Sequence, residues 1–302
     1  MEKLVLKTLS GSRTATNIAS SYGTDVQHTE QAKSSFANKA LNYSATFWFV
    51  SILLGQWLFF YFIIAFYGFS VINDNMEIWN RWESLGSTPY KAADTIGNMM
   101  FAIHAIGAGI VAFGGALQLI PKVRQVAPKF HRVNGYVYLC TVFLLAMSGF
   151  YLSLIRGASP DATSAIGTSI NGILILVFAF LTVQTARKRK LAEHRKWAIR
   201  LFLVSNAQWM LRVGVFSYMI TGTIVGGNPK FGDPFFAIWT FACYLLPLAC
   251  AELYFYSSEK RNNKLKIVTA LALILLTLLM LIGITGLTPF LSQLLSGGPI
   301  EI

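Results

Sequence analysis

The chain has 302 residues, of which 54% are hydrophobic and only 13% are charged, whereas a typical soluble domain has about 25% charged residues. This composition excludes an ordinary soluble domain. The formal net charge of +12 would suit a nucleic-acid-binding protein, but the basic residues lie in short loops between long apolar runs, and that distribution excludes the class.

Apolar residues gather in seven runs of about 20 residues or more, long enough to cross the hydrocarbon core of a bilayer as helices. In lipid, only helices and closed barrels satisfy the backbone hydrogen bonds, and continuous runs lack the alternation of a barrel strand. We therefore expect an all-α fold, a polytopic membrane helical bundle with seven transmembrane helices. The approximate limits of the runs are 46–72, 96–120, 132–155, 166–186, 197–222, 235–257 and 266–287.

The basic residues predict the orientation of the bundle. If the first run starts inside, the three cytoplasmic loops carry fourteen lysines and arginines and the opposite loops carry four. Short cytoplasmic loops are the ones enriched in Lys and Arg. We therefore expect a multi-pass protein of the cell (cytoplasmic) membrane, with its N-terminus in the cytoplasm, its C-terminus outside, the lipid bilayer as its partner and no nucleic acid bound.

The composition divides the chain into three parts. Residues 1–45 are rich in Ser, Thr, Ala and Asn, and we expect a flexible cytoplasmic tail there. Residues 46–290 form the seven-span bundle, with the core at 96–257, and residues 291–302 form a short outer tail. No secretory signal peptide is expected, because the first apolar run comes too late and is too long.

The longest outer loop, residues 73–95, contains acidic residues together with Trp79 and Trp82. Indole rings are enriched at the boundary between lipid and water. We expect a short helix that lies at this interface with its indoles at headgroup level.

Two charged residues inside the runs are expected to form a structural ion pair. Arg200 lies about one turn from the cytoplasmic end of its run, and Glu252 lies about one turn from the same end of the next. Glu252 is the only acidic residue within any run. A charge at this depth requires a partner, so we expect Arg200 and Glu252 to bind each other.

Two histidines, His131 and His194, open the third and fifth runs and are level at the cytoplasmic boundary. Two neutral imidazoles that face each other across a bundle can ligate haem iron or another metal. The alternative is a pair of interfacial histidines beside arginines that contact lipid phosphates and loop carbonyls.

A second polar group is expected in the outer half of the bundle, where His104, Asn171, Gln208 and Arg212 lie at similar depth. No acid in the runs can neutralise Arg212 at that level. A buried guanidinium without a carboxylate predicts a pocket for a small ligand such as an anion, a quinone or a substrate carbonyl. The alternative is that Arg212 extends outward to the interface and His104 bonds a neighbouring helix.

The order of these polar residues resembles a known family. The segments HAIGAGIVAFGGALQLIPKVRQVAPKFHRVNGYVYL and AEHRKWAIRLFLVSNAQWMLRV resemble the membrane proteins grouped as domain of unknown function 2306, over residues 96–215. The resemblance implies a membrane bundle and no particular activity. The residues that carry it are His104, Gln118, His131, Arg132, Gly135, Tyr138, His194, Arg195, Trp197, Arg200 and Arg212.

The histidine arrangement is also similar to that of transmembrane b-type cytochromes, in which ligand histidines pair between alternate helices. His131 and His194 fit one such pair, whereas His104 has no histidine on the fourth run, so the likeness implies at most a single b-type haem. The leading hypothesis is a membrane-embedded protein that binds a small ligand, a quinone or haem, and any enzymatic role would be oxidoreductase-type electron transfer. The alternatives are a small transporter or channel, and a structural membrane subunit.

Overall fold

A computed structural model describes residues 36–85, 88–230 and 232–297, and these form helices and connecting loops without a strand. This confirms the all-α membrane bundle. Six helices are long and apolar enough to cross a bilayer. The first, Phe36–Ile72, includes the segments η1 (Ile64–Gly68) and α2 (Phe69–Ile72). The others are α3 (Thr95–Leu119), α5 (Pro128–Phe150) continued by η3 (Tyr151–Ile155), α6 (Ala162–Arg187), α9 (Pro234–Glu259) and α10 (Asn263–Ser296).

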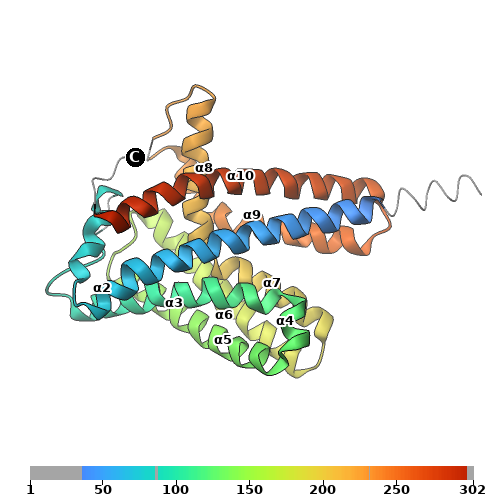
Figure 1. Cartoon of the computed structure of the whole chain (residues 1–302), viewed down its shortest axis with the longest axis horizontal. Coiled ribbons are helices and arrows are strands. Elements are labelled where there is room, and N and C mark those ends of the chain that lie inside the picture. Colours follow the sequence, from blue (N-terminus) through green and yellow to red (C-terminus); the bar gives the residue numbers. More distant parts are fainter. Residues whose placement is uncertain (1–35, 86–87, 231, 298–302) are drawn as a thin grey trace, which may run out of the picture.

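Helices that follow one another in the chain pack as neighbours in the bundle. Helix α3 packs against α5, and α5 packs against α6 (Figure 1). The first helix and α10 run side by side, and short α4 (Pro121–Val126) joins α3 to α5 (Figure 1). The ends of α3, α6 and α9 and the starts of the first helix, α5 and α10 therefore lie at one end of the bundle, which the basic loops predict to be cytoplasmic.

The fifth expected run, 197–222, is not one continuous helix, so the count of seven spanning helices is not confirmed. It is divided at Asn206 into α7 (Leu191–Ser205) and α8 (Ala207–Ile224). The side-chain amide of Asn206 donates to the carbonyl oxygen of Phe202 at 2.7 Å. A polar side chain that bonds the preceding turn in this way bends a helix.

Helix α8 then runs across α10 instead of along it (Figure 1). The crossing is close because Gly283 of α10 lies against the backbone of Val213, where a side chain on residue 283 would overlap the Val213 carbonyl. Small residues at such crossings let two helix backbones approach. The position of α8 therefore depends on Gly283.

The first helix begins ten residues before the expected span. Residues 1–35 of the expected tail lie outside the described residues, whereas residues 36–45 are helical. Ala37 and Leu41 are buried on this extension, and the Nζ atom of Lys266 donates to Asn38 at 2.7 Å. Packing against α10 therefore extends the helix beyond its apolar run. At the other terminus, residues 291–296 of the expected outer tail belong to α10, and residues 298–302 lie outside the described part.

The outer loop contains the expected short helix, η2 (Met76–Leu85), a 3₁₀ segment. The side chain of Trp79 is fully buried within the protein, and its indole N–H donates to the hydroxyl of Ser70. Arg81 of η2 donates to the carbonyl oxygens of Gln293 and Leu294 at the end of α10. A cation there satisfies terminal carbonyls and is favoured by the helix dipole.

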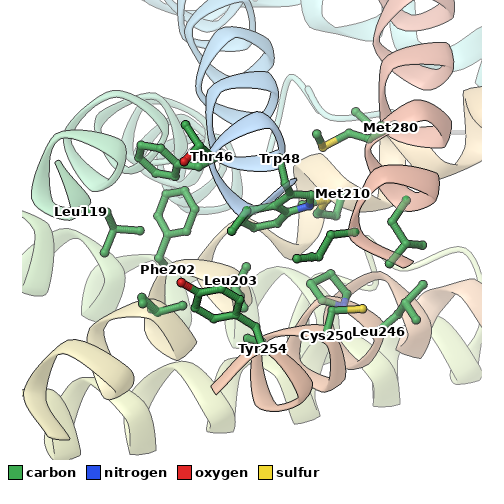
Figure 2. A pocket seen from close by; sticks show the side chains of 18 of the residues that line it. Thr46, Trp48, Leu119, Phe202, Leu203, Met210, Leu246, Cys250, Tyr254 and Met280 are labelled. Atoms are coloured by element: carbon green, nitrogen blue, oxygen red, sulfur yellow. The ribbon is translucent and has the colours of Figure 1, made fainter. Parts of the chain in front are cut away.

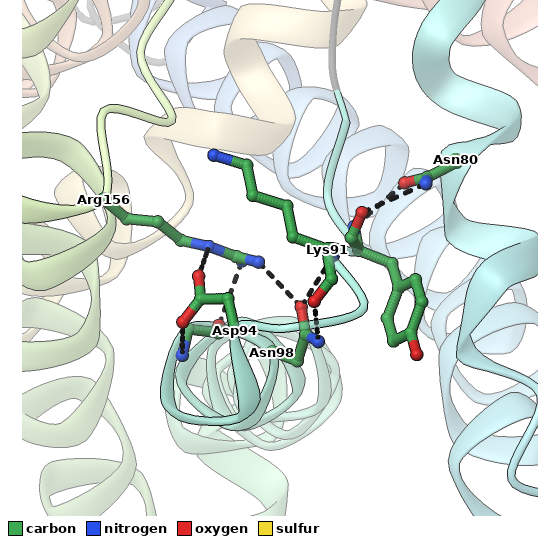
Figure 3. A network of polar contacts seen from close by, with 7 residues as sticks. Asn80, Lys91, Asp94, Asn98 and Arg156 are labelled. Carbon is green, nitrogen blue, oxygen red and sulfur yellow. Dashed lines mark hydrogen bonds and ion pairs between the residues drawn. The ribbon is translucent and has the colours of Figure 1, made fainter.

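A polar network fastens the same loop to the outer end of the bundle (Figure 3). Arg156, whose side chain is only 4% exposed, donates to the carboxylate of Asp94 at 2.8 Å, to the carbonyl of Gly97 at 3.0 Å and to the amide oxygen of Asn98 at 2.7 Å. Asn98 in turn bonds the backbone N–H and carbonyl of Lys91. The N–H of Gly97 and the Arg156 guanidinium hold the pKa of Asp94 below its usual value.

We predict that Arg156→Leu lowers the midpoint of thermal unfolding in detergent by roughly 5 °C, because three acceptors lose their donor. Lys91→Met is the matched control, since Lys91 gives only backbone atoms to the hydrogen bonds of the network and its charge is the smallest of the influences on the pKa of Asp94. Because the pKa of Asp94 is lowered, its contribution to stability is present at neutral pH and is lost as the pH falls through that pKa. The difference between the two variants should therefore decrease in acid. Equal midpoints at neutral pH would contradict this account.

Candidate functional site

A cavity of about 800 Å³ lies within the bundle. Its walls come from the first helix, α7, α8, α9 and α10, and one end is formed by the end of α3, by α4 and by the start of α5. The volume falls within the range of about 300–1,000 Å³ that is typical of sites for small ligands and cofactors. The division of α7 from α8 contributes to this shape, because α8 turns away and presents one face to the cavity.

Most of the cavity wall is apolar. Trp48 of the first helix, Phe202 of α7, Met210 of α8, Tyr254 of α9 and Met280 of α10 surround one space (Figure 2). Methionine and aromatic side chains adapt to ligands of irregular shape. The cavity is therefore suited to a molecule whose larger part is a hydrocarbon.

Helix α9 contributes a proline to this wall. Pro247 lies inside α9 and lines the cavity together with Cys243 and Cys250. Proline has no N–H to donate to the carbonyl four residues earlier, which here belongs to Cys243. A backbone acceptor without its usual helical donor is therefore next to the cavity.

The polar lining is concentrated where α3 ends and where α5 and α7 begin. The group there includes Gln118, Arg124, His131, His194 and Arg195, with Asn42 and Thr46 of the first helix also in the lining, whereas the polar residues that α8 contributes, Ser217, Tyr218 and Thr221, are uncharged. The amide of Gln118 donates to the carbonyl oxygen of His131 at 3.0 Å, which joins α3 to α5. Among the described residues that line the cavity there is no aspartate or glutamate. This end therefore carries positive charge without an acidic counterpart in the lining.

The two histidines that the sequence placed level with each other do line the same cavity, and they are close enough to interact electrostatically. The Nδ1 atom of His194 lies 3.0 Å from the carbonyl oxygen of Thr182, so this nitrogen carries the proton and Nε2 retains its lone pair. The Nδ1 atom of His131 is buried without a hydrogen-bond partner. Both rings therefore keep a nitrogen that can accept a proton or bind a metal.

A protein-only metal centre is not evident in the described part of the chain, since it has no group of three or more His, Cys, Asp or Glu side chains placed to hold an ion. The two histidines would have to act with a ligand or cofactor that completes the coordination. Haem iron, which has four ring nitrogens of its own, requires only two axial ligands and is compatible with such a pair.

None of the four residues of the expected outer pocket lines this cavity. The side chains of His104, Asn171 and Arg212 instead bond nearby groups within the bundle, although the amide oxygen of Asn171 is buried without a hydrogen-bond partner. His104 lies 3.0 Å from the hydroxyl of Ser148, Asn171 donates to the carbonyl of Val204 at 3.1 Å, and Arg212 donates to the carbonyl of Gln208 at 2.8 Å. The structure therefore places these residues within helix packing, with Arg212 also over the ring of Phe59 at 5.7 Å.

The structure does bring Arg200 and Glu252 together. Two nitrogens of Arg200 donate to the two carboxylate oxygens, at 2.6 and 2.9 Å, and the guanidinium lies 4.3 Å from the ring centre of Trp197. A second pair, Lys196 with Glu259, joins the same two helices. Both pairs hold α7 against α9, and neither acid lines the cavity.

Sequence reasoning did not assign Arg124 or Arg195 to a site, because both were interpreted as signals of membrane orientation. The depth argument that paired the two histidines also applies to Gln118 and Arg195, which lie at the same boundary, and could have added them. No sequence signal indicates Trp48, since which helices enclose a space depends on the packing order of the bundle.

Comparison with known proteins agrees with this architecture. The model of the family described as predicted membrane protein (DUF2306) matches residues 101–255, just over half of the chain. The chain belongs to this family. No curated protein and no solved structure matches it. The DUF2306 region contains both arginines and both histidines of the lining, whereas the first helix and α10, which complete the wall, lie outside the match.

The three cysteines provide a test of the cavity. Cys140 is exposed, and of the two cysteines that line the cavity Cys250 is partly exposed and Cys243 is buried. In detergent, a small maleimide should modify Cys140 first, Cys250 more slowly and Cys243 least, as measured by mass spectrometry of peptides. Ala251→Trp, which places a ring in the cavity wall, should slow the modification of Cys250 roughly tenfold.

Ala249→Trp is the control, because Ala249 is equally close in sequence to Cys250 but is exposed and does not line the cavity. Equal rates at Cys250 in the two tryptophan variants would argue against an accessible cavity.

Proposed function

We propose that this DUF2306 protein is a membrane-embedded binding protein for a small lipid-soluble molecule, which occupies the cavity enclosed by the first helix and α7–α10. The observation that carries the proposal is the combination of an apolar wall with a cluster of polar groups at one end of the same cavity. Sites for small molecules have this composition, in which apolar surface provides affinity and a few polar groups fix the orientation.

The position of the polar groups supports an amphiphilic ligand. The cluster lies where helices α5 and α7 begin, at the end of the bundle that carries the basic loops. A molecule in a bilayer keeps its polar part near the headgroups and its hydrocarbon in the core. The two arginines of the lining, Arg124 and Arg195, both lie at that end, so the ligand would enter the cavity in the orientation that it already has in the membrane.

A transporter mechanism is less well supported by the same geometry. A pathway for a charged solute requires polar residues along its length, whereas here the two charged residues, Arg124 and Arg195, lie at one end and the middle is formed by groups such as Met210 and Met280. The polar residues that α8 contributes, Ser217, Tyr218 and Thr221, carry no charge. The buried polar residues of the outer half bond to one another and to backbone carbonyls.

Extraction of the purified protein tests the proposal. Ala198 lines the cavity on α7, and we predict that Ala198→Trp lowers the amount of co-purified lipid-soluble molecule on the order of tenfold, because overpacking of this kind costs at least one factor of ten in affinity. Ala192→Trp is the matched control on the exposed start of α7. The measurement is mass spectrometry of organic extracts, and the absence of any molecule that distinguishes the two variants would contradict the proposal.

A second candidate, a redox protein with a single b-type haem, is favoured by the two histidines in the lining. The hydrogen bond from His194 to the Thr182 carbonyl leaves Nε2 as the coordinating atom, which is the arrangement that haem ligands usually have. His131 would supply the other axial ligand. Haem would provide one-electron chemistry, while these residues would hold it and set its orientation.

Optical spectroscopy tests this candidate. Protein purified from haem-replete cells should show a Soret band, and His131→Ala and His194→Ala should each abolish the spectrum of a six-coordinate iron. His104→Ala is the control, because His104 does not line the cavity. Colourless protein would exclude haem and leave the lipid-soluble ligand as the function.

A further inference from the structure

We propose that the ligand of this cavity is an anionic amphiphile, with a carboxylate or phosphate head held by Arg124 and Arg195 and an acyl or isoprenoid chain inside the bundle. This inference rests on the proposed binding function and adds the chemical class of the ligand. The class of ligand is inferred from the charged residues of the lining, and the apolar residues do not determine it.

The polar end of the cavity presents donors in excess of acceptors. Arg124 and Arg195 are permanently charged. The described lining contains no carboxylate that could neutralise them. The acids on α7 and α9 are paired with other cations: Glu193 with Lys190, Glu252 with Arg200 and Glu259 with Lys196. An anion supplied by a ligand would provide the missing charge.

The two arginines are placed to meet a headgroup and not a buried ion. Both are exposed residues at the boundary of the cavity, on α4 and at the start of α7. The first turns of α5 and α7, which carry the two histidines, also direct the positive ends of their helix dipoles toward this region. Arginine binds carboxylate and phosphate through paired N–H groups.

A neutral quinone would not require two arginines at the polar end of the cavity. A quinone carbonyl is satisfied by one or two hydrogen-bond donors such as Gln118 or a histidine, whereas two unpaired guanidinium groups next to it would gain little. The composition of the lining therefore favours a ligand with a full negative charge.

Quenching of Trp48 provides the test. Trp48 lines the cavity, so a brominated chain bound there should quench its fluorescence, isolated as the difference between the unmodified protein and Trp48→Phe. The probes are dibromostearic acid and its methyl ester, which share the chain and differ in the charge of the head. In the full-length protein in detergent at neutral pH, the acid should bind about tenfold or more tightly than the ester.

Two variants identify the groups responsible. The double substitution Arg124→Gln with Arg195→Gln should bring the affinities of acid and ester to within about twofold of each other. The double substitution Lys129→Gln with Arg132→Gln removes the same two charges from the same end of the bundle without touching the lining, and should retain the full preference for the acid.

Competition identifies the form of the anion. Hexadecyl phosphate should displace the brominated acid, and inorganic phosphate at the same concentration should not. Displacement by inorganic phosphate would show that the site takes the head alone, and would overturn an amphiphilic ligand.

The outcomes separate the two proposals. Equal binding of acid and ester by the unmodified protein would overturn the anionic head and leave the lipid-binding cavity intact. No quenching of Trp48 by either probe would overturn both. A preference for the acid that survives the double substitution would overturn the assignment to Arg124 and Arg195.

Discussion

The close crossing of α8 over α10 is the constraint on which the cavity depends. A continuous helix from residue 191 to residue 224 would have run beside its neighbours and filled the bundle. The chain instead turns at Asn206, and Gly283 lets the backbone of α8 lie directly on α10. Because α8 turns away from α7 there, it becomes a wall of the cavity and α7 ends beside it. A side chain at residue 283 would displace that wall.

The polar residues of the bundle divide into two groups with different physical roles. At the outer end, Arg156 and Asp94 bind each other and the backbone around them, so their hydrogen bonds are internal and fix a loop. At the opposite end, Arg124 and Arg195 surround an opening with no acid in the described lining. Buried hydrogen-bond donors normally have acceptors within the protein. The donors at this end of the cavity exceed the acceptors in its lining, so a ligand would supply the missing acceptors.

The sequence predicted the parts of this arrangement that depend on length and depth. Long apolar runs specify spanning helices, and the rise per residue placed His131 and His194 at one level and Arg200 beside Glu252. It did not predict the break at Asn206, because hydropathy is averaged over a window and a single side chain that bonds the preceding turn barely changes it. Nor did it predict that Arg212 bonds the carbonyl of Gln208, since a local backbone acceptor leaves no mark in the pattern of residues.

Orientation in the membrane and the proposed recognition of a headgroup place different requirements on the basic residues at this end of the bundle. Orientation depends on the number of lysines and arginines near the ends of the helices, so Arg132 and Arg124 contribute equally to it. Recognition depends on position, and of these two only Arg124 lines the cavity. A charge that is needed only for orientation can be moved along a loop without consequence, whereas a charge that holds a headgroup cannot. Substitutions at Arg124 and Arg132 should therefore affect orientation equally but ligand binding differently. This difference distinguishes a binding residue from an orientation signal within one short segment.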